Sequence, residues 1–297
     1  MSSFTTESVS DDIETLVKRV VNHGGEINTN KMLSFRKSAE EGVGVFAKEA
    51  LEQATVVMKI PYADCISVDS VTQCEALSCI FTEQPGLLEY PDEVLAIGLM
   101  HAALPCGASC GWADHVLTMP QANEINSTLY WTEEELEELN GCTVYHLTSM
   151  MKRQIAADWE GIHSALVEAY PQALRGATQE LYRWALSMVY SRAVGLHRKN
   201  VYSRVIAPVL DLANHSPSVG SETADTFHYN EEVCLFALSY KCTWAYIYAV
   251  YMRLYIYILV LHIFSNRTSS SDFHPRVPGF TPCGSRRTNI RHIWPLS

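Results

Sequence analysis

One stretch decides the fold of this chain: Val205-Ile206-Ala207-Pro208-Val209-Leu210-Asp211-Leu212-Ala213-Asn214-His215-Ser216. Its first half is apolar and β-branched, which is typical of a buried strand. Its second half gathers polar side chains, and Asn-His-Ser-Pro is also what an ordinary turn looks like. The residues alone leave two interpretations open, a strand that ends in a surface turn and a strand that delivers an amide and an imidazole to a ligand.

Length and composition predict a folded globular protein. The chain has 297 residues, of which 47% are hydrophobic and 19% are charged, so it can bury a real core as one large domain or two small ones. Its net charge of −11 argues against a general nucleic-acid binder, which needs a basic face against phosphates. An acidic surface suits a basic protein substrate instead.

The cysteines and the N-terminal residues indicate the cellular compartment of the protein. The nine cysteines are odd in number and include no CxxC pair, which favours a reducing environment over a disulfide framework. Residues 1–12 contain no Lys or Arg and lack the patterns of a signal or transit peptide. We therefore expect a cytoplasmic or nuclear protein.

Hydrophobic spacing predicts strands toward both ends of the folded part and helices between them. Thr132 and Glu135 form a capping box that begins one helix. The opening stretch is expected to be a strand that runs toward Asp211, after a polar loop over 195–203. The other predicted helices cover 11–21, 93–104, 144–170 and 178–194, and the other predicted strands cover 32–35, 43–47, 55–60 and 230–238.

Four residues in or beside a Gly-rich loop have the donor types of a zinc site. They are His101, Cys106, Cys110 and His115. The spacing between the cysteines falls within the range of such sites, but neither histidine has a partner at a known ligand spacing. The match is better explained as accidental, and we expect no metal.

Four stretches, taken in order, resemble the SET-domain methyltransferases of the Rubisco large-subunit methyltransferase type. They are residues 36–47, which look like the opening cofactor-binding turn and strand; 112–141, which look like part of the helical insert; 191–193, a Ser-Arg-Ala signature followed by Val194 where the family has an aromatic residue; and 208–217, which resemble the Asn-His-Ser core motif. The match covers about residues 20–240.

The resemblance implies an α+β fold, a β-rich SET domain interrupted by a large helical insert. The expected divisions are an N-terminal helix and lead-in at 1–27, the SET domain at 28–240 with its insert at about 75–190, and an anomalous apolar run with a disordered basic tail at 241–297. It further implies a protein-lysine N-methyltransferase that uses S-adenosyl-L-methionine (AdoMet), works as a monomer and needs no metal, nucleic acid or membrane. Its substrate would be a lysine-containing protein.

The resemblance also assigns site residues. The expected cofactor-binding residues are Glu41, Gly42, Val43, Gly44, Arg192, Asn214 and His215, and those expected at the substrate channel are Asp211, Ser191 and Tyr229. The Gly-Glu-x-Val…Tyr segment that supplies the family's catalytic tyrosine and closes its knot is missing after the strand at 233–238, so the catalytic residue is unknown. Two alternatives stay open, a catalytically silent binding or scaffold protein and a protein-histidine methyltransferase.

The character of the sequence changes near residue 240. Residues 241–297 hold seven Lys or Arg and one acid, and six of the 15 tyrosines lie between 240 and 257. The apolar run 242–264 could be a membrane anchor, although Arg253 near its middle would cost about 2.5–3.5 kcal/mol. It could also be a helix that replaces a lost domain, or a translated non-coding segment. The abrupt change in composition favours the last interpretation.

Overall fold

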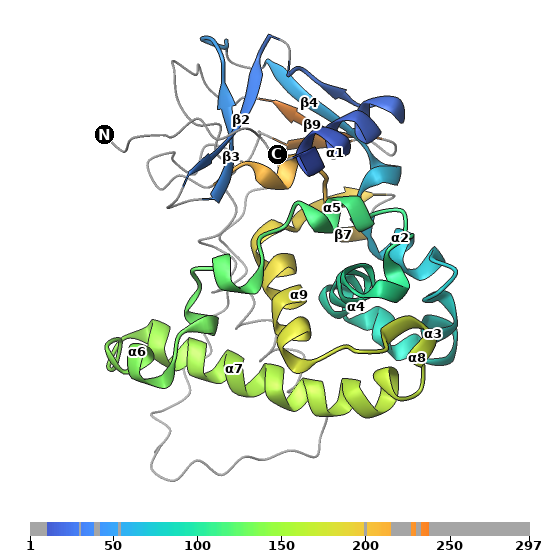
Figure 1. Cartoon of the computed structure of the whole chain (residues 1–297), viewed down its shortest axis with the longest axis vertical. Helices are drawn as coiled ribbons and strands as arrows, with labels where there is room; N and C mark the ends of the chain where they lie inside the picture. Colours follow the sequence, from blue (N-terminus) through green and yellow to red (C-terminus); the bar gives the residue numbers. More distant parts are fainter. Residues whose placement is uncertain are drawn as a thin grey trace, which may run out of the picture. The chain divides into compact units, whose positions relative to one another are not determined.

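Strands come from both ends of the described chain and helices from its middle, which confirms the expected mixed α+β fold (Figure 1). The computed structural model describes residues 11–29, 31–38, 42–52, 55–198, 201–214, 227–229 and 233–237. The domain boundaries inferred above, and the expected absence of a knot-closing segment, stay predictions. Residues 238–297 lie outside the described part.

The strands form three small antiparallel sheets. The first has the order β1-β4-β9-β8, the second pairs β2 with β3, and the third has the order β5-β7-β6. Pairing of β4 with β9 joins segments from the two ends of the described chain. The strands are β1 (Glu26–Ile27), β2 (Leu33–Ser38), β3 (Gly42–Ala47), β4 (Val56–Pro61), β5 (Ile66–Ser67), β6 (Val194–Arg198), β7 (Val201–Ile206), β8 (Phe227–Tyr229) and β9 (Val233–Ala237).

The helices follow the predicted amphipathic patterns. The α-helices are α1 (Asp11–Asn22), α2 (Val68–Gln73), α3 (Ser78–Glu83), α4 (Pro91–Ala103), α5 (Ala113–Leu117), α6 (Glu133–Glu137), α7 (Thr143–Ile162), α8 (Pro171–Leu174) and α9 (Gln179–Arg192). The capping box is confirmed, since Thr132 accepts the amide of Glu135 at the start of α6. Helix α4 is buried without a break from Val94 to Ala102, and it packs against α9 (Figure 1).

Three details of the predicted elements are wrong. The helix expected over 144–170 ends at Ile162 and continues as a π-helical turn, and Pro171 begins α8 because its missing N–H suits the first position of a helix. The loop expected over 195–203 is the β6–β7 hairpin. The strand expected to reach Asp211 ends at Ile206, before Pro208, which has no N–H for a ladder.

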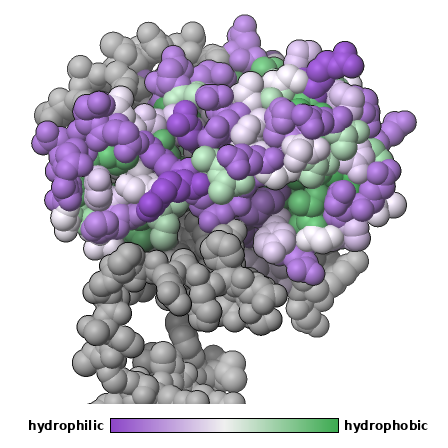
Figure 2. All heavy atoms as spheres, turned by 90° about the horizontal axis from the view of Figure 1, so that it is seen from below, coloured by the Kyte–Doolittle hydropathy of each residue, from purple (hydrophilic) through white to green (hydrophobic). Residues whose placement is uncertain are grey.

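The buried hydrophobic residues form two cores. The first is built mainly from the helices and includes Trp112 and Val116 of the α5 region. The second combines α1 with the strands and includes Leu210 and Leu212. On the face shown in Figure 2, hydrophilic residues predominate and hydrophobic ones form small separate patches.

The described cysteines and helices bear on two further expectations. The six cysteines whose side chains are described are all free thiols. No helix among the described residues is both long enough and apolar enough to cross a bilayer. The apolar run 242–264 lies outside the described residues.

Candidate cofactor site

The C-terminal end of α9 is held by a buried arginine. Arg204, on β7, is 2% exposed, and its Nη2 donates to the carbonyls of Val189 at 3.2 Å and Ala193 at 3.3 Å. Its Nη1 forms an ion pair with Asp92 in the first turn of α4. The carbonyl of Val189 also accepts the amide of Ala193, whereas the last carbonyls of a helix, such as that of Ala193, have no partner within it. Arg204 therefore satisfies the end of α9 and fixes the residue that precedes Ala193, Arg192.

A tight turn after β7 places Asp211 and Asn214. Val209 has φ +68°, a left-handed conformation that β-branched residues rarely adopt, and its side chain is fully buried. The turn is closed by hydrogen bonds from the amide of Asp211 to the carbonyl of Ala207 and from the amide of Ala213 to the carbonyl of Leu210. Strain of this kind persists where the surroundings over-determine the backbone, and it concentrates at functional sites.

Arg192 and Asp211 form the centre of the site. Nη1 of Arg192 donates to the carbonyl of Asp211 at 2.9 Å and to its Oδ2 at 3.0 Å. The Asp211 side chain is 1% exposed, whereas that of Arg192 is 17% exposed. Within the described chain, both hydrogen bonds of Arg192 are made by Nη1. One edge of its guanidinium thus holds the turn, and the side chain still reaches the surface.

A histidine contacts the other carboxylate oxygen. Nε2 of His115, on α5, lies 3.1 Å from Oδ1 of Asp211, and the His115 side chain is fully buried. The two atoms are not aligned as a hydrogen bond, so the contact is an electrostatic one. Burial raises the pKa of Asp211, but His115 and Arg192 lower it by more, and the net result is a pKa below the usual value. The carboxylate is therefore ionised at neutral pH.

Strand β3 meets the same turn. A Cβ atom built on Gly44 would lie 3.1 Å from Nδ2 of Asn214 and 3.3 Å from the ring of Phe46. Gly42, at the start of β3, has φ +69°, and apart from its chain neighbours no atom of the described residues lies within 4 Å of the position of a Cβ there. The two glycines therefore differ, since Gly44 accommodates Asn214, whereas Gly42 pairs with Ser38 in the hairpin and takes a left-handed φ.

The structure brings together four of the residues that the sequence nominated, Gly44 with Asn214 and Arg192 with Asp211. Ser191 is exposed, and its Oγ donates to the carbonyl of Ser187 one turn earlier at 2.7 Å. Val43 pairs with Lys37 in the β2–β3 hairpin, and Tyr229 lies in β8, where only its backbone is described. Glu41 and His215 lie outside the described residues, and the individual roles of all these residues stay predictions.

Three of the four residues with zinc-ligand types have other side-chain contacts. Nδ1 of His101 lies 2.8 Å from the carbonyl of Ala173, and Sγ of Cys106 donates to the same oxygen at 3.1 Å. His115 faces Asp211 instead. In the part of the chain that the structure describes, no three His, Cys, Asp or Glu residues are grouped as metal ligands.

The residues of the site suit the cofactor that the resemblance implies. AdoMet carries a carboxylate, which a partly exposed guanidinium can bind by charge-assisted hydrogen bonds. It also has polar groups that an open glycine backbone can approach. The charge of Arg192, the glycine backbone at Gly42 and Gly44 and the amide of Asn214 are thus the features that suit such a ligand. A separate cavity of about 340 Å³ between α1, β1 and β4 is lined by none of these residues.

Comparisons with known proteins find distant relatives of the chain. The chain is 25% identical over 223 residues to the ribulose-1,5 bisphosphate carboxylase/oxygenase large subunit N-methyltransferase of Pisum sativum, a match that covers 73% of this chain and 42% of that protein. It is 25% identical over 183 residues to the [fructose-bisphosphate aldolase]-lysine N-methyltransferase of Arabidopsis thaliana, covering 61% of this chain and 36% of that protein. The chain thus spans less than half the length of these relatives. No family model matches it.

Solved structures show the same fold. The SET domain of LSMT bound to lysine and AdoHcy superposes with a TM-score of 0.69 at 21% identity, covering 82% of this chain and 54% of that one. Rubisco LSMT bound to AdoMet superposes with a TM-score of 0.68 at 22% identity, with the same coverage. The chain is therefore a distant relative of the SET-domain methyltransferases of the Rubisco large-subunit type, and it has the fold of their SET domain.

Proposed function

We propose that this protein is an AdoMet-dependent protein-lysine N-methyltransferase of the SET type. One observation carries the proposal: segments 42–44, 192 and 211–214, nominated separately by their sequences, meet through the contacts Gly44–Asn214 and Arg192–Asp211. The relatives support the acceptor, since the Arabidopsis protein is by name a lysine N-methyltransferase. The net charge of −11 supports a basic protein substrate, and we propose a cytoplasmic or nuclear location.

In this function Arg192 would bind the carboxylate of the cofactor, a contact that a lysine could not copy because it lacks the planar fork of donors. The backbone at Gly42 and the amide of Asn214 would hold the rest of the cofactor body. The bound cofactor supplies a methyl group on a positively charged sulfur. The protein would accelerate its transfer mainly by alignment, which is worth up to about 7–11 kcal/mol in well-oriented systems.

The acceptor amine must be neutral to react. A lysine has a pKa of about 10.4 and is almost wholly protonated at neutral pH, so the site has to remove a proton and exclude water. The described residues do not identify the group that receives this proton. The proposal therefore assigns cofactor-holding residues and leaves the catalytic base open.

The test uses the full-length protein and separates binding from transfer. Isothermal titration with S-adenosyl-L-homocysteine (AdoHcy) measures binding, and incubation of protein extracts with labelled AdoMet, followed by mass spectrometry, measures transfer. We expect binding that Arg192→Ala abolishes, and label on lysine. Absence of binding would overturn the proposal. Binding without label would favour a silent binding protein, and label on histidine would favour a histidine methyltransferase.

A further inference from the structure

His115 contacts the centre of the site, although the resemblance assigns it no role. It lies on α5, with its ring fully buried, and its Nε2 is 3.1 Å from Oδ1 of Asp211. Arg192 contacts the other oxygen, Oδ2, at 3.0 Å. Each oxygen of the Asp211 carboxylate therefore has its own partner, and the two partners come from different helices.

This contact also connects the two hydrophobic cores. Trp112 and Val116, which flank His115, belong to the core of the helices. Leu210 and Leu212, which flank Asp211, belong to the core of α1 and the strands. The pair His115–Asp211 is thus a polar contact between the two cores, at the turn that carries Asn214.

The position of the ring hydrogen of His115 follows from its neighbour. Nε2 must carry its hydrogen, because a lone pair facing the ionised Asp211 carboxylate would be repelled. Nδ1 is then left buried, and it has no hydrogen-bond partner among the described residues. A buried polar atom in this state costs free energy that an apolar side chain would not. The presence of an imidazole here indicates that its contact with Asp211 has a use.

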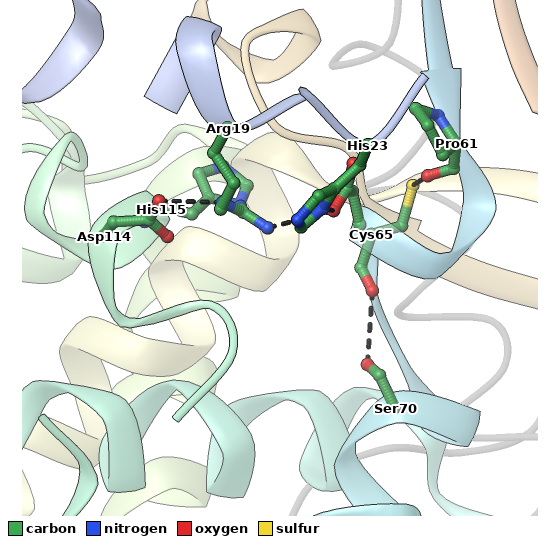
Figure 3. A network of polar contacts seen from close by, with 8 residues as sticks. Arg19, His23, Pro61, Cys65, Ser70, Asp114 and His115 are labelled. Atoms are coloured by element: carbon green, nitrogen blue, oxygen red, sulfur yellow. Dashed lines mark hydrogen bonds and ion pairs between the residues drawn. The ribbon is translucent and has the colours of Figure 1, made fainter. Parts of the chain in front are cut away.

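Helix α1 is joined to α5 by an ion pair between Arg19 and Asp114. Nε of Arg19 donates to Oδ2 of Asp114 at 2.7 Å, and the other oxygen of Asp114 accepts the amide of His115 at 2.8 Å. Nη1 of Arg19 donates to Oδ1 of Asp64 at 3.1 Å, and Nδ1 of His23 lies 2.6 Å from the same oxygen. Figure 3 shows Arg19 reaching Asp114 beside His115. One guanidinium thus joins two carboxylates from different segments, which the single ammonium of a lysine could not do with the same geometry.

We propose that His115 is a positioning residue that holds the Asp211 carboxylate opposite Arg192, and that Arg19 fixes His115 through Asp114. The turn at 209–214, and with it Asn214, would then depend on Arg19 of α1, a helix that lies outside all four family-like stretches. The consequence for cofactor affinity rests on the proposed function. The consequence for the turn does not, so the two can be tested separately.

The first measurement is hydrogen exchange of the amides of Asp211, Leu212 and Ala213 in the protein without cofactor. His115→Phe keeps a ring and removes the polar Nε2–H group that faces Asp211, so we expect exchange at these amides to become about tenfold faster. His115→Gln can place an N–H near the position of Nε2 and should restore slow exchange. The matched control is Lys18→Ala, because the Lys18–Glu14 pair lies on α1 but is exposed, and it should leave exchange unchanged.

Arg19→Gln should also accelerate exchange of the same amides. Combining it with His115→Phe should add little further acceleration, because both changes interrupt the same series of contacts, from Arg19 through Asp114 and His115 to Asp211. Equal exchange in His115→Phe and wild type would overturn the proposal. So would acceleration spread evenly over the whole domain, or failure of His115→Gln to restore slow exchange. Should His115→Phe fail to fold, Asp114→Asn tests the same series of contacts with little change in side-chain shape, and it should also accelerate exchange of these amides.

The second measurement is AdoHcy affinity by titration. We expect His115→Phe to weaken it about tenfold and Lys18→Ala to leave it unchanged. Unchanged affinity in His115→Phe, with faster exchange, would overturn the cofactor part alone. A wild-type protein that binds no AdoHcy would overturn the proposed function, and the exchange measurement would still decide whether His115 positions Asp211.

Discussion

Gly44 lies so close to Asn214 that a Cβ atom at position 44 would be 3.1 Å from the side-chain nitrogen of Asn214. This distance is shorter than a comfortable carbon–nitrogen contact, so the amide would have to shift by a few tenths of an ångström. A strand position normally favours alanine over glycine by about 0.5–1 kcal/mol, through the entropy of the unfolded chain. The glycine is therefore explained by its contact with Asn214 and not by the strand.

Gly44→Ala should for this reason separate binding from stability. The entropic gain offsets the crowding, and we expect a free energy of unfolding within about 1 kcal/mol of wild type. The displaced Asn214 amide should weaken AdoHcy binding about tenfold. Gly111→Ala is the matched control, since Gly111 is exposed and has no atom within 4 Å of its Cβ position. Equal affinities of the two variants for AdoHcy would show that the contact does not matter for binding.

Arg192→Lys tests whether the site needs a guanidinium or only a positive charge. Nη1 of Arg192 holds both the carbonyl and the carboxylate of Asp211, and among the described residues no hydrogen bond of its other donors is seen. A lysine cannot serve both, so we expect AdoHcy affinity to fall at least about tenfold. Titration of Arg175→Lys, at an exposed arginine, gives the comparison. Retention of wild-type affinity in Arg192→Lys would mean that only the charge is required.

These residues differ in how far sequence could predict them. Gly44, Arg192, Asp211 and Asn214 lie in short stretches with a recognisable order of residue types, so their neighbourhood could be inferred. His115 could not, because its role depends on a contact with Asp211, which is far away in the chain. The sequence placed His115 in or beside a Gly-rich loop and offered only a zinc interpretation for it.

The errors in the fold have equally local causes. Gly195 and its polar neighbours favoured a loop, but Tyr202 packs so closely over Gly195 that a Cβ there would lie 2.5 Å from the Tyr202 hydroxyl, and this packing belongs to a hairpin. The helix expected over 144–170 was too long because a π-helical turn over 163–167 does not interrupt the apolar pattern. The left-handed Val209 opposes the preference of its residue type, so only the folded structure reveals it.

Asp92→Asn should destabilise the protein, because it leaves the buried charge of Arg204 without its counter-ion. Removing one partner of a buried ion pair costs about 3–5 kcal/mol. The double variant Asp92→Asn, Arg204→Met should recover part of this loss, since it removes the unpaired charge as well. The free energies of unfolding of Asp92→Asn, Arg204→Met and the double variant, measured in urea against wild type, give the coupling. Additive effects of the two changes would show that the pair contributes no coupling energy.

Because Asp211 is ionised in the folded protein, the free energy of unfolding should fall at low pH. Its pKa lies below the usual value in the folded protein, because His115 and Arg192 together outweigh the effect of burial. The folded state therefore binds this proton more weakly than the unfolded chain, whose aspartate pKa is about 3.9. The contribution to stability is fully present above that pH, and it is lost as the pH falls through the lower pKa of the folded state.

Asp211→Asn removes this contribution at every pH. At pH 7 we expect a loss of about 3–5 kcal/mol, because Arg192 and His115 keep their places without a carboxylate between them. The difference from wild type should shrink as the pH falls below about 4, since protonation then removes the same charge from wild type. Urea unfolding between pH 3 and pH 7 measures the difference in free energy of unfolding between Asp211→Asn and wild type. Glu138→Gln, at an exposed acid, is the control. A difference that stayed constant over this range would mean that the charge of Asp211 contributes nothing to stability.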